Sequence, residues 1–375
     1  MMKFETKIVT LLMCVALSLL SSCNKKLPDT PVQEQQVPVG FRAMSQAVWV
    51  KSDETPKTTF PYSDFGVWGI ARQTGVQSPY TLWTNGQLTK VSAPAGTQTS
   101  QPEGNVVFTP ETAAYWIRDY DYTFLAVAPY NDAGFALSGI TTKEAQANAT
   151  PAIQNPLDYM TFTYDMSTKY NGIPANGSTP AVAPDYDFDL LGAAAKQLVE
   201  TGGYSTSQPL MFWHLLSKIC IKVNFVGASG TVDQIRLSNV VTKGNYVISL
   251  DDEDDFDKPL SVTCTPSTAV ADMISSSSPL ILDSDNQDLN TTTPQWTLHI
   301  IPQAVSGFDL YIYFTVGAST VTNFKVNLSA AGTAPYTYNG SYNWILNITP
   351  NGITFDVAIV PWVDDSTGDN DFDFE

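Results

Sequence analysis

Apolar and polar residues alternate along most of this chain, and this period of two constrains the fold more than any other feature of the sequence. Such alternation is typical of a β-strand with one buried face. Sustained helical periodicity is nearly absent, and only 110–115 and 192–199 have the pattern of short helices. The sequence therefore predicts an all-β fold, with strands in the following segments: 37–41, 65–67, 122–128, 218–225, 296–300, 310–316, 324–328, 342–348 and 353–359.

The length of 375 residues suggests two domains, at roughly 150 residues per domain. Many short strands separated by turns favour β-sandwiches. A Gly-, Ser- and Thr-rich stretch at 200–209 is the best candidate for the boundary, and no internal repeat of fixed period is visible. We predict an N-terminal β-sandwich over 37–204, a C-terminal β-sandwich over 205–363 and an acidic tail over 364–375.

The N-terminus carries Lys3 and Lys7, followed by an apolar run over 8–20. That run is too short for a membrane-spanning helix, which needs about 20 residues, but it fits the core of a signal peptide. The segment ends in Leu20-Ser21-Ser22-Cys23, and small residues before a cysteine are what a lipoprotein signal peptidase requires. We predict a signal peptide over 1–22 and lipidation of Cys23. An ordinary secretory signal with a chance cysteine is the alternative.

The residues after the predicted cleavage site are polar, contain two prolines and have no apolar periodicity. We interpret 23–36 as a tether that holds the folded part away from the bilayer. Several acyl chains make such an attachment durable. The expected location is therefore the outer membrane and the cell surface, with the membrane contacted through the N-terminal lipid only.

Two thiols are left in the predicted domains, Cys220 and Cys264, once Cys14 is removed and Cys23 is lipidated. Export permits a disulfide between them. However, Cys220 lies on an alternating strand, and nothing in the sequence places Cys264 beside it. Two free, buried thiols are therefore the default expectation.

The chain is acidic, with 19 Lys+Arg against 37 Asp+Glu and a formal charge of −18. An acidic surface repels the phosphate backbone, so nucleic acid is not an expected partner. The densest acidic run, 251–257, lacks the spaced ligands and the glycine of an EF-hand. We interpret it as a solvated loop rather than a calcium site, and the sequence predicts neither a metal nor a cofactor.

Histidine-based catalysis has few residues available, because His214 and His299 are the only histidines. No nucleophile or carboxylate partner for His214 is evident from the sequence, so we expect a core histidine bonded to backbone. His299 is expected to be an ordinary strand residue. The recognisable catalytic motifs are absent, and we predict that the protein is not an enzyme. A glycan-cleaving enzyme with two carboxylates is the weakest alternative.

A carbohydrate-binding surface protein is the stronger alternative, because such proteins are also aromatic-rich β-sandwiches. It would require a flat exposed platform of aromatic rings, for which Trp68, Trp83 and Trp116 are candidates. We expect most of these rings to fill the core, since buried aromatic side chains dominate the energetics of sandwiches.

Several short motifs occur in an order that carries further information, and the most specific is the run Phe-x-His-x-Leu-Ser-Lys-Ile over 212–219. The others are Phe-Gly-Val-Trp at 65–68, Tyr-Trp at 115–116, the strand ending in Ala-Pro at 122–129, Asp-Leu-Leu-Gly-Ala at 189–193, Gly-Ser-Tyr at 340–342, Ile-Thr-Phe at 353–355 and Pro-Trp at 361–362. With these motifs, nearly the whole mature chain resembles the fimbrillin family, the Mfa-like pilins and adhesins of type V pili.

Two positions depart from the family pattern. Leu215 stands where a smaller residue is common, and Gly192 stands where an aromatic residue is common. The acidic tail also extends past the last tryptophan motif. These departures leave open whether the chain is a stalk, an anchor or a tip subunit.

The resemblance implies two tandem transthyretin-like Greek-key β-sandwiches, which join other pilin subunits by donor-strand exchange. In this family, a protease cut after a basic residue frees the first strand. Val37, Val39 and Phe41 alternate as such a displaced donor strand would, and Arg42-Ala43 lies at its end. The alternative is that Arg42 is a solvent-facing residue of a strand that stays in place. The surface ligand of such an adhesin, host or bacterial, is left open.

Overall fold

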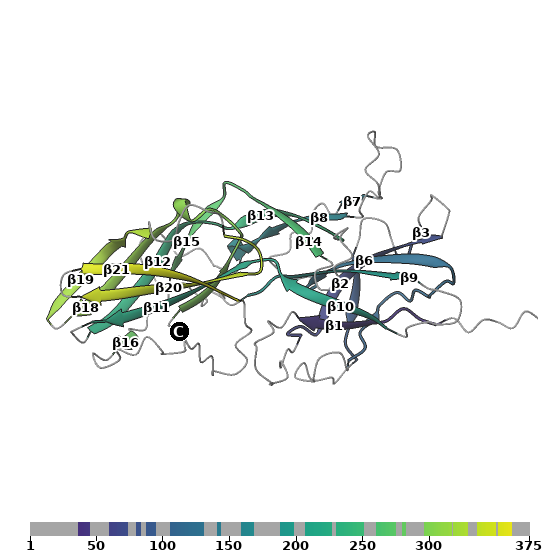
Figure 1. Ribbon diagram of the computed structural model, residues 1–375, viewed down its shortest axis with the longest axis horizontal. Helices are drawn as coiled ribbons and strands as arrows, with labels where there is room; N and C mark the ends of the chain where they lie inside the picture. Colours follow the sequence, from purple (N-terminus) through teal and green to yellow (C-terminus); the bar gives the residue numbers. More distant parts are fainter. Residues whose placement is uncertain are drawn as a thin grey trace, which may run out of the picture. The chain divides into compact units, whose positions relative to one another are not determined.

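The structure is a computed structural model (Figure 1), which describes residues 37–45, 60–73, 80–83, 88–94, 106–130, 141–143, 159–168, 188–198, 207–226, 230–250, 260–274, 280–282, 296–316, 318–328, 336–349 and 352–361. Two compact units are distinguished, 1–38 and 39–375, and only Val37 and Pro38 of the first are described. In the described part of the second unit, two short 3-10 helices, η1 (Met166–Thr168) and η2 (Val305–Gly307), accompany the strands. The all-β prediction is confirmed. The described residues include no helix long and apolar enough to cross a membrane.

The strands form four sheets (Figure 1). Sheet 1 runs in the order β1 (Phe41–Ser45), β10 (Gln208–His214), β9 (Leu191–Leu198), β6 (Tyr120–Ala128), β2 (Asp64–Gln73), β4 (Thr89–Ser92) and β5 (Thr109–Pro110), with β3 (Tyr80–Thr81) paired to β2. Sheet 2 runs in the order β14 (Leu260–Pro266), β13 (Lys243–Leu250), β8 (Tyr159–Asp165) and β7 (Thr141–Lys143).

The other two sheets contain most of the C-terminal strands. Sheet 3 runs in the order β17 (Trp296–Ile300), β11 (Ser217–Phe225), β20 (Gly340–Thr349) and β21 (Gly352–Pro361). Sheet 4 runs in the order β15 (Val270–Ile274), β12 (Gly230–Val241), β18 (Asp309–Val316) and β19 (Ser319–Val326), with β16 (Leu280–Leu282) paired to β12.

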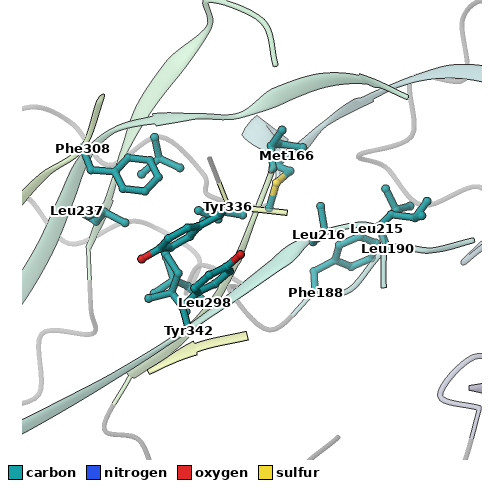
Figure 2. Packing of buried hydrophobic residues seen from close by; sticks show 14 of the residues in the cluster. Met166, Phe188, Leu190, Leu215, Leu216, Leu237, Leu298, Phe308, Tyr336 and Tyr342 are labelled. Atoms are coloured by element: carbon teal, nitrogen blue, oxygen red, sulfur yellow. The ribbon is translucent and has the colours of Figure 1, made fainter. Parts of the chain in front are cut away.

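The sheets pack against one another as in a β-sandwich. Strands β13 and β14 of sheet 2 lie against sheet 1, and β21 of sheet 3 lies against β19 of sheet 4. Buried apolar residues from both pairs of sheets form one cluster, part of which is drawn in Figure 2. The sandwich-type fold is thus confirmed, whereas the Greek-key connectivity and the boundary between 204 and 205 stay predictions.

At two places the chain passes from a strand of one sheet into a strand of another after only one or two residues. Strand β10 of sheet 1 passes into β11 of sheet 3 through Leu215 and Leu216, and β12 of sheet 4 passes into β13 of sheet 2 through Thr242. Gln303 supports the second crossing, because its amide accepts from the Val241 N–H at 2.8 Å and donates to the Val241 carbonyl at 3.2 Å. Both crossings are buried, so they tie the sheets together without exposing backbone groups.

The helical expectation for 192–199 is wrong, because these residues form most of β9. This strand pairs on one side with β6 and on the other with β10. Its alanines, at 193–195, are buried, and their small side chains suit a strand enclosed within the molecule. Tertiary pairing has overridden the helix propensity of alanine. No helix forms over 110–115 either, since Pro110 ends β5.

The two departures from the family pattern lie against each other. A Cβ atom on Gly192 would lie 2.9 Å from Cδ2 of Leu215, closer than real contacts allow. Leu215 is fully buried and therefore occupies the space that a side chain at 192 would need. The absence of a side chain at Gly192 therefore makes room for the larger residue at Leu215.

The same kind of aromatic corner occurs in sheet 1 and in sheet 3. Tyr122, at the start of β6, accepts a hydrogen bond from the Ile117 N–H five residues upstream. Tyr342, at the start of β20, accepts one from the Thr337 N–H over the same interval, at 3.0 Å. Each tyrosine packs against an aromatic side chain six residues upstream, edge-on for Tyr122 and stacked for Tyr342. Each is followed two residues later by another aromatic residue and preceded, three positions earlier, by a residue in the left-handed region. These residues are Trp116, Asp119 and Phe124 in one corner, and Tyr336, Asn339 and Trp344 in the other. These are tyrosine corners of the kind that close sandwich folds.

Candidate functional site: the strand that closes sheet 1

Strand β1 is short and runs parallel to β10. Its register pairs Phe41 with Gln208 and continues without a shift to Ser45 and Phe212. The Gln208 N–H donates to the Gly40 carbonyl at 2.7 Å, just before the strand. The five residues of β1 are thus hydrogen-bonded along the edge of β10, a strand that lies much later in the sequence.

The other edge of β1 is paired as well. Phe41 and Phe108 exchange backbone hydrogen bonds of 3.0 and 2.8 Å, and the Val39 N–H donates to the Ala114 carbonyl at 2.8 Å. Phe108 directly precedes β5, the last strand of sheet 1. Strand β1 therefore joins the two ends of sheet 1, and both ends contain backbone groups that only it satisfies through these bonds.

Alternate side chains of this segment point into the core. Val39, Phe41 and Ala43 are 2%, 0% and 4% exposed, whereas Arg42 is exposed. Val37 belongs to the other compact unit, where it is half-buried and lies outside any strand. The alternation seen in the sequence is therefore present in the fold, with Arg42 on the solvent face.

The Phe41 ring is the centre of an aromatic cluster. Its centroid lies 5.1 Å from that of Phe124, 6.1 Å from that of Phe65 and 6.4 Å from that of Trp83. Complete burial of a phenylalanine side chain contributes about 1.5–3 kcal/mol. Most of the stabilisation that β1 supplies through side chains is thus concentrated in one ring.

The predicted cleavage site lies within β1 rather than at its end. The peptide bond between Arg42 and Ala43 belongs to a backbone paired with Pro209 and Leu210. The arginine side chain is accessible to solvent, while the residue after it is buried. Cleavage there stays a prediction. Four other predicted features lie outside the described residues: the box Leu20-Ser21-Ser22, the lipidated Cys23, the acidic run 251–257 and the tail 364–375.

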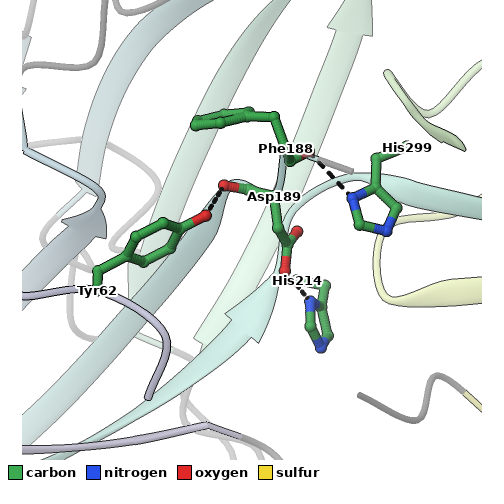
Figure 3. A network of polar contacts seen from close by, with 5 residues as sticks. All are labelled: Tyr62, Phe188, Asp189, His214 and His299. Carbon is green, nitrogen blue, oxygen red and sulfur yellow. Dashed lines mark hydrogen bonds and ion pairs between the residues drawn. The ribbon is translucent and has the colours of Figure 1, made fainter. Parts of the chain in front are cut away.

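A buried polar cluster lies where sheets 1 and 3 meet (Figure 3). Nδ1 of His214, at the end of β10, lies 2.5 Å from Oδ2 of Asp189. Nδ1 of His299, on β17, lies 3.0 Å from the Phe188 carbonyl oxygen. The Tyr62 hydroxyl donates to the Asp189 carbonyl. His214 is buried in the core as expected, but its Nδ1 contacts a carboxylate 25 positions upstream rather than a backbone group. His299, expected to be an ordinary strand residue, has the backbone contact instead.

Burial lowers the pKa of His299 below the ordinary value of 6.5, and the nearby Lys218 ammonium lowers it further. The Asp189 carboxylate and the Phe188 carbonyl oppose this shift without reversing it. The described residues contain no group of three His, Cys, Asp or Glu side chains that could hold a metal ion.

The rings proposed for a carbohydrate platform are in the core. Trp68, Trp83 and Trp116 are 1%, 7% and 6% exposed. The Trp83 Nε1–H donates to the Thr112 carbonyl at 2.8 Å, and Trp116 packs edge-on against Tyr122. These three residues therefore offer no flat surface to a sugar.

The two thiols are free, and they lie in different sheets. Cys220 on β11 is buried, and Cys264 on β14 is half-buried. Burial raises the pKa of Cys264 to about 11. The expectation that the two thiols form no disulfide is confirmed, although Cys264 is less buried than expected.

Strand β11 was predicted to have one buried face and one exposed face. Lys218 and Cys220, on the face predicted to be exposed, are buried, so this prediction is wrong at the beginning of the strand.

The sequence matches the model of the fimbrillin-like family over residues 63–362. The match covers most of the chain, which therefore belongs to the fimbrillin-like family, a family of fimbrial structural proteins. No curated protein matches the chain significantly.

Several solved structures are similar in fold. A fimbrial protein from Bacteroides vulgatus is 16% identical, with a TM-score of 0.48, 86% of this chain covered and 99% of the other. A fimbrial assembly protein from Parabacteroides distasonis is 11% identical, with a TM-score of 0.39 and 87% and 99% covered. The tip fimbrial protein Mfa3 from Porphyromonas gingivalis, with a C-terminal truncation, is 12% identical, with a TM-score of 0.38 and 87% and 100% covered.

Proposed function

We propose that this protein is a lipid-anchored fimbrial subunit of the cell surface, and that β1 is the strand replaced when subunits join. The observation that carries the proposal is that β1 pairs with β10 on one side and with the segment at Phe108 on the other, with Phe41 inserted among aromatic side chains. Membership of the fimbrillin-like family supports the fimbrial role.

The loss of β1 would create a complete acceptor site for another strand. The edge of β10 and the carbonyls of Phe108 and Ala114 would lose their partners. A pocket lined by Phe65, Trp83 and Phe124 would open where Phe41 had been. An extended segment from a second subunit, with apolar residues at alternate positions, satisfies both needs.

Lipidation of Cys23 is the second part of the proposal, and a Cys23→Ser variant tests it. The variant should be absent from the outer-membrane fraction, because it has no thiol to acylate. Ala substitution of Cys220, which is buried in β11, serves as the control and should leave fractionation unchanged. Retention of Cys23→Ser in the membrane fraction would contradict the lipid anchor.

N-terminal sequencing of protein from the cell surface tests the strand replacement. We expect a chain that starts at Ala43, because a cut after Arg42 releases Val39 and Phe41 from the core. The Arg42→Ala variant should retain the longer N-terminus, whereas Arg118→Ala, at another exposed arginine, should be processed normally. Surface protein that starts only at lipidated Cys23 would contradict replacement of β1.

A further inference from the structure

The polar cluster at the meeting of sheets 1 and 3 holds two parts of the chain together. His299 on β17 donates to the carbonyl of Phe188. Phe188 is the first residue of the short segment 188–190, which leads directly into β9. Next to it, the Leu215 N–H donates to the Leu190 carbonyl at 2.7 Å. We call this contact, between β17 and residues 188–190, the seam. Its histidine bond joins sheet 3 to the segment that leads into β9 of sheet 1.

The described part of the seam contains one ammonium group, one carboxylate and two imidazoles. Lys218 lies directly opposite His299 in the register of β11 and β17 and is 7% exposed. The only described carboxylate that acts on His299 is that of Asp189, which is already in contact with Nδ1 of His214. Asp189, Lys218 and His214 are the charged or titratable groups that act on the His299 ring in the described part of the molecule. Figure 3 shows the His299 ring next to the Phe188 backbone and the His214 ring next to the Asp189 carboxylate.

We propose that the seam is an acid-sensitive lock, which loosens when the imidazole of His299 takes up a proton. A cation at this position would be buried beside the Lys218 ammonium and would share a single carboxylate with His214. An isolated buried charge is costly unless it is paired. The lock is a property of the fold and does not depend on strand replacement at β1.

The direction of the pH effect follows from linkage. In the closed seam, burial keeps the pKa of His299 below 6.5, so the ring is neutral at neutral pH. In an open seam the ring is solvated and has its ordinary pKa of about 6.5. The open form therefore binds more protons as the pH falls below that value, and acid favours opening. Above about pH 7.5 the ring is neutral in both forms and the effect vanishes.

Hydrogen exchange of the mature chain tests the lock. Protection of the amides in β17 and in 188–198, corrected for intrinsic exchange rates, should fall between pH 7.5 and pH 5.5. The largest fall consistent with a pKa of 6.5 in the open form is about tenfold. Amides in the middle of β18, which belongs to sheet 4, should keep their protection over the same range.

The His299→Asn variant is the matched control, because its amide N–H replaces the Nδ1 donor to Phe188 and does not titrate. It should lose the acid-dependent change in protection at the seam. The proposal is overturned if the protection of the seam in the natural chain does not change with pH, or if His299→Asn changes as much.

A measurement on the natural chain covers the case in which His299→Asn fails to fold. The chain has only two histidines, so an untagged mature protein gives two imidazole Cε1–H signals by NMR, and their assignment follows from His214→Asn. The signal of His299 should titrate below pH 6.5. Titration at or above 6.5 would overturn the lock.

Discussion

Sheets 1 and 3 contain the same tyrosine corner, but each completes it differently. In sheet 1, the aromatic residue after the corner is Phe124, and Phe41 packs on it edge-on at 5.1 Å. In sheet 3, the equivalent residue is Trp344, and Phe355 packs on it edge-on at 5.4 Å. The rings are alike in geometry. They differ in where the covering ring comes from.

Phe355 belongs to β21, which pairs with β20 over its whole length and begins three positions after β20 ends. Phe41 belongs to a five-residue strand near the N-terminus, which is paired to strands much later in the sequence. A hairpin partner stays at high local concentration and is costly to remove, whereas a terminal strand is held only by its own contacts. If subunits join by the strand replacement proposed above, the comparison favours sheet 1 over sheet 3 as the sheet that exchanges a strand.

The largest effect should come from removal of the Phe41 ring. The Phe41→Ala variant should lose about 3–5 kcal/mol of unfolding free energy, as expected for a large aromatic residue cut out of a core. Arg42→Ala, on the solvent face of the same strand, should stay within about 0.5 kcal/mol of the natural chain. Urea unfolding of both variants checks this. Equal losses would show that β1 is not anchored by Phe41.

An intermediate effect is expected where β9 and the β10–β11 crossing meet. The Gly192→Phe variant should lose about 1–3 kcal/mol, because the ring collides with Leu215 in a filled core. Leu215→Ala in the same chain should recover part of that loss, since it restores the combination typical of the family. A double-mutant cycle measures this coupling. Additive losses would contradict the explanation that the two residues compensate each other.

The smallest effects should come from the corners themselves. Tyr122→Phe and Tyr342→Phe each remove one hydroxyl that accepts a backbone N–H, so each should cost about 1 kcal/mol. Thermal unfolding at neutral pH measures both. Losses of similar size would sharpen the comparison by showing that the corners are equivalent and that only their covering strands differ.

Every segment that the sequence predicted as a strand overlaps a strand of the fold, because alternation is a local signal, but β8, β12 and β13 were not predicted. The prediction failed at 192–199, because the composition of this segment favours a helix whereas its pairing with β6 and β10 makes it a strand. The parallel pairing of β1 with β10 could not be foreseen, since register between distant segments leaves no trace in either one. The same holds for the contact between His214 and Asp189.

The corners escaped sequence analysis for a different reason. Their spacing is conserved between the two sheets, but the residue types are not: Trp116 corresponds to Tyr336, and Asp119 to Asn339. Each exchange keeps the physical role, a flat ring in one case and tolerance of the left-handed region in the other. A search for identical residues therefore finds no repeat.

The most direct test of the account is electrophoresis of surface protein in SDS without strong heating. Subunits that exchange a whole strand are held by ladder hydrogen bonds and buried apolar side chains, so the natural chain should give a heat-resistant ladder of polymers. Arg42→Ala should weaken or abolish that ladder, because an uncut β1 stays in place and leaves no acceptor site for a strand of the next subunit. A natural chain that runs only as a monomer would contradict assembly through β1.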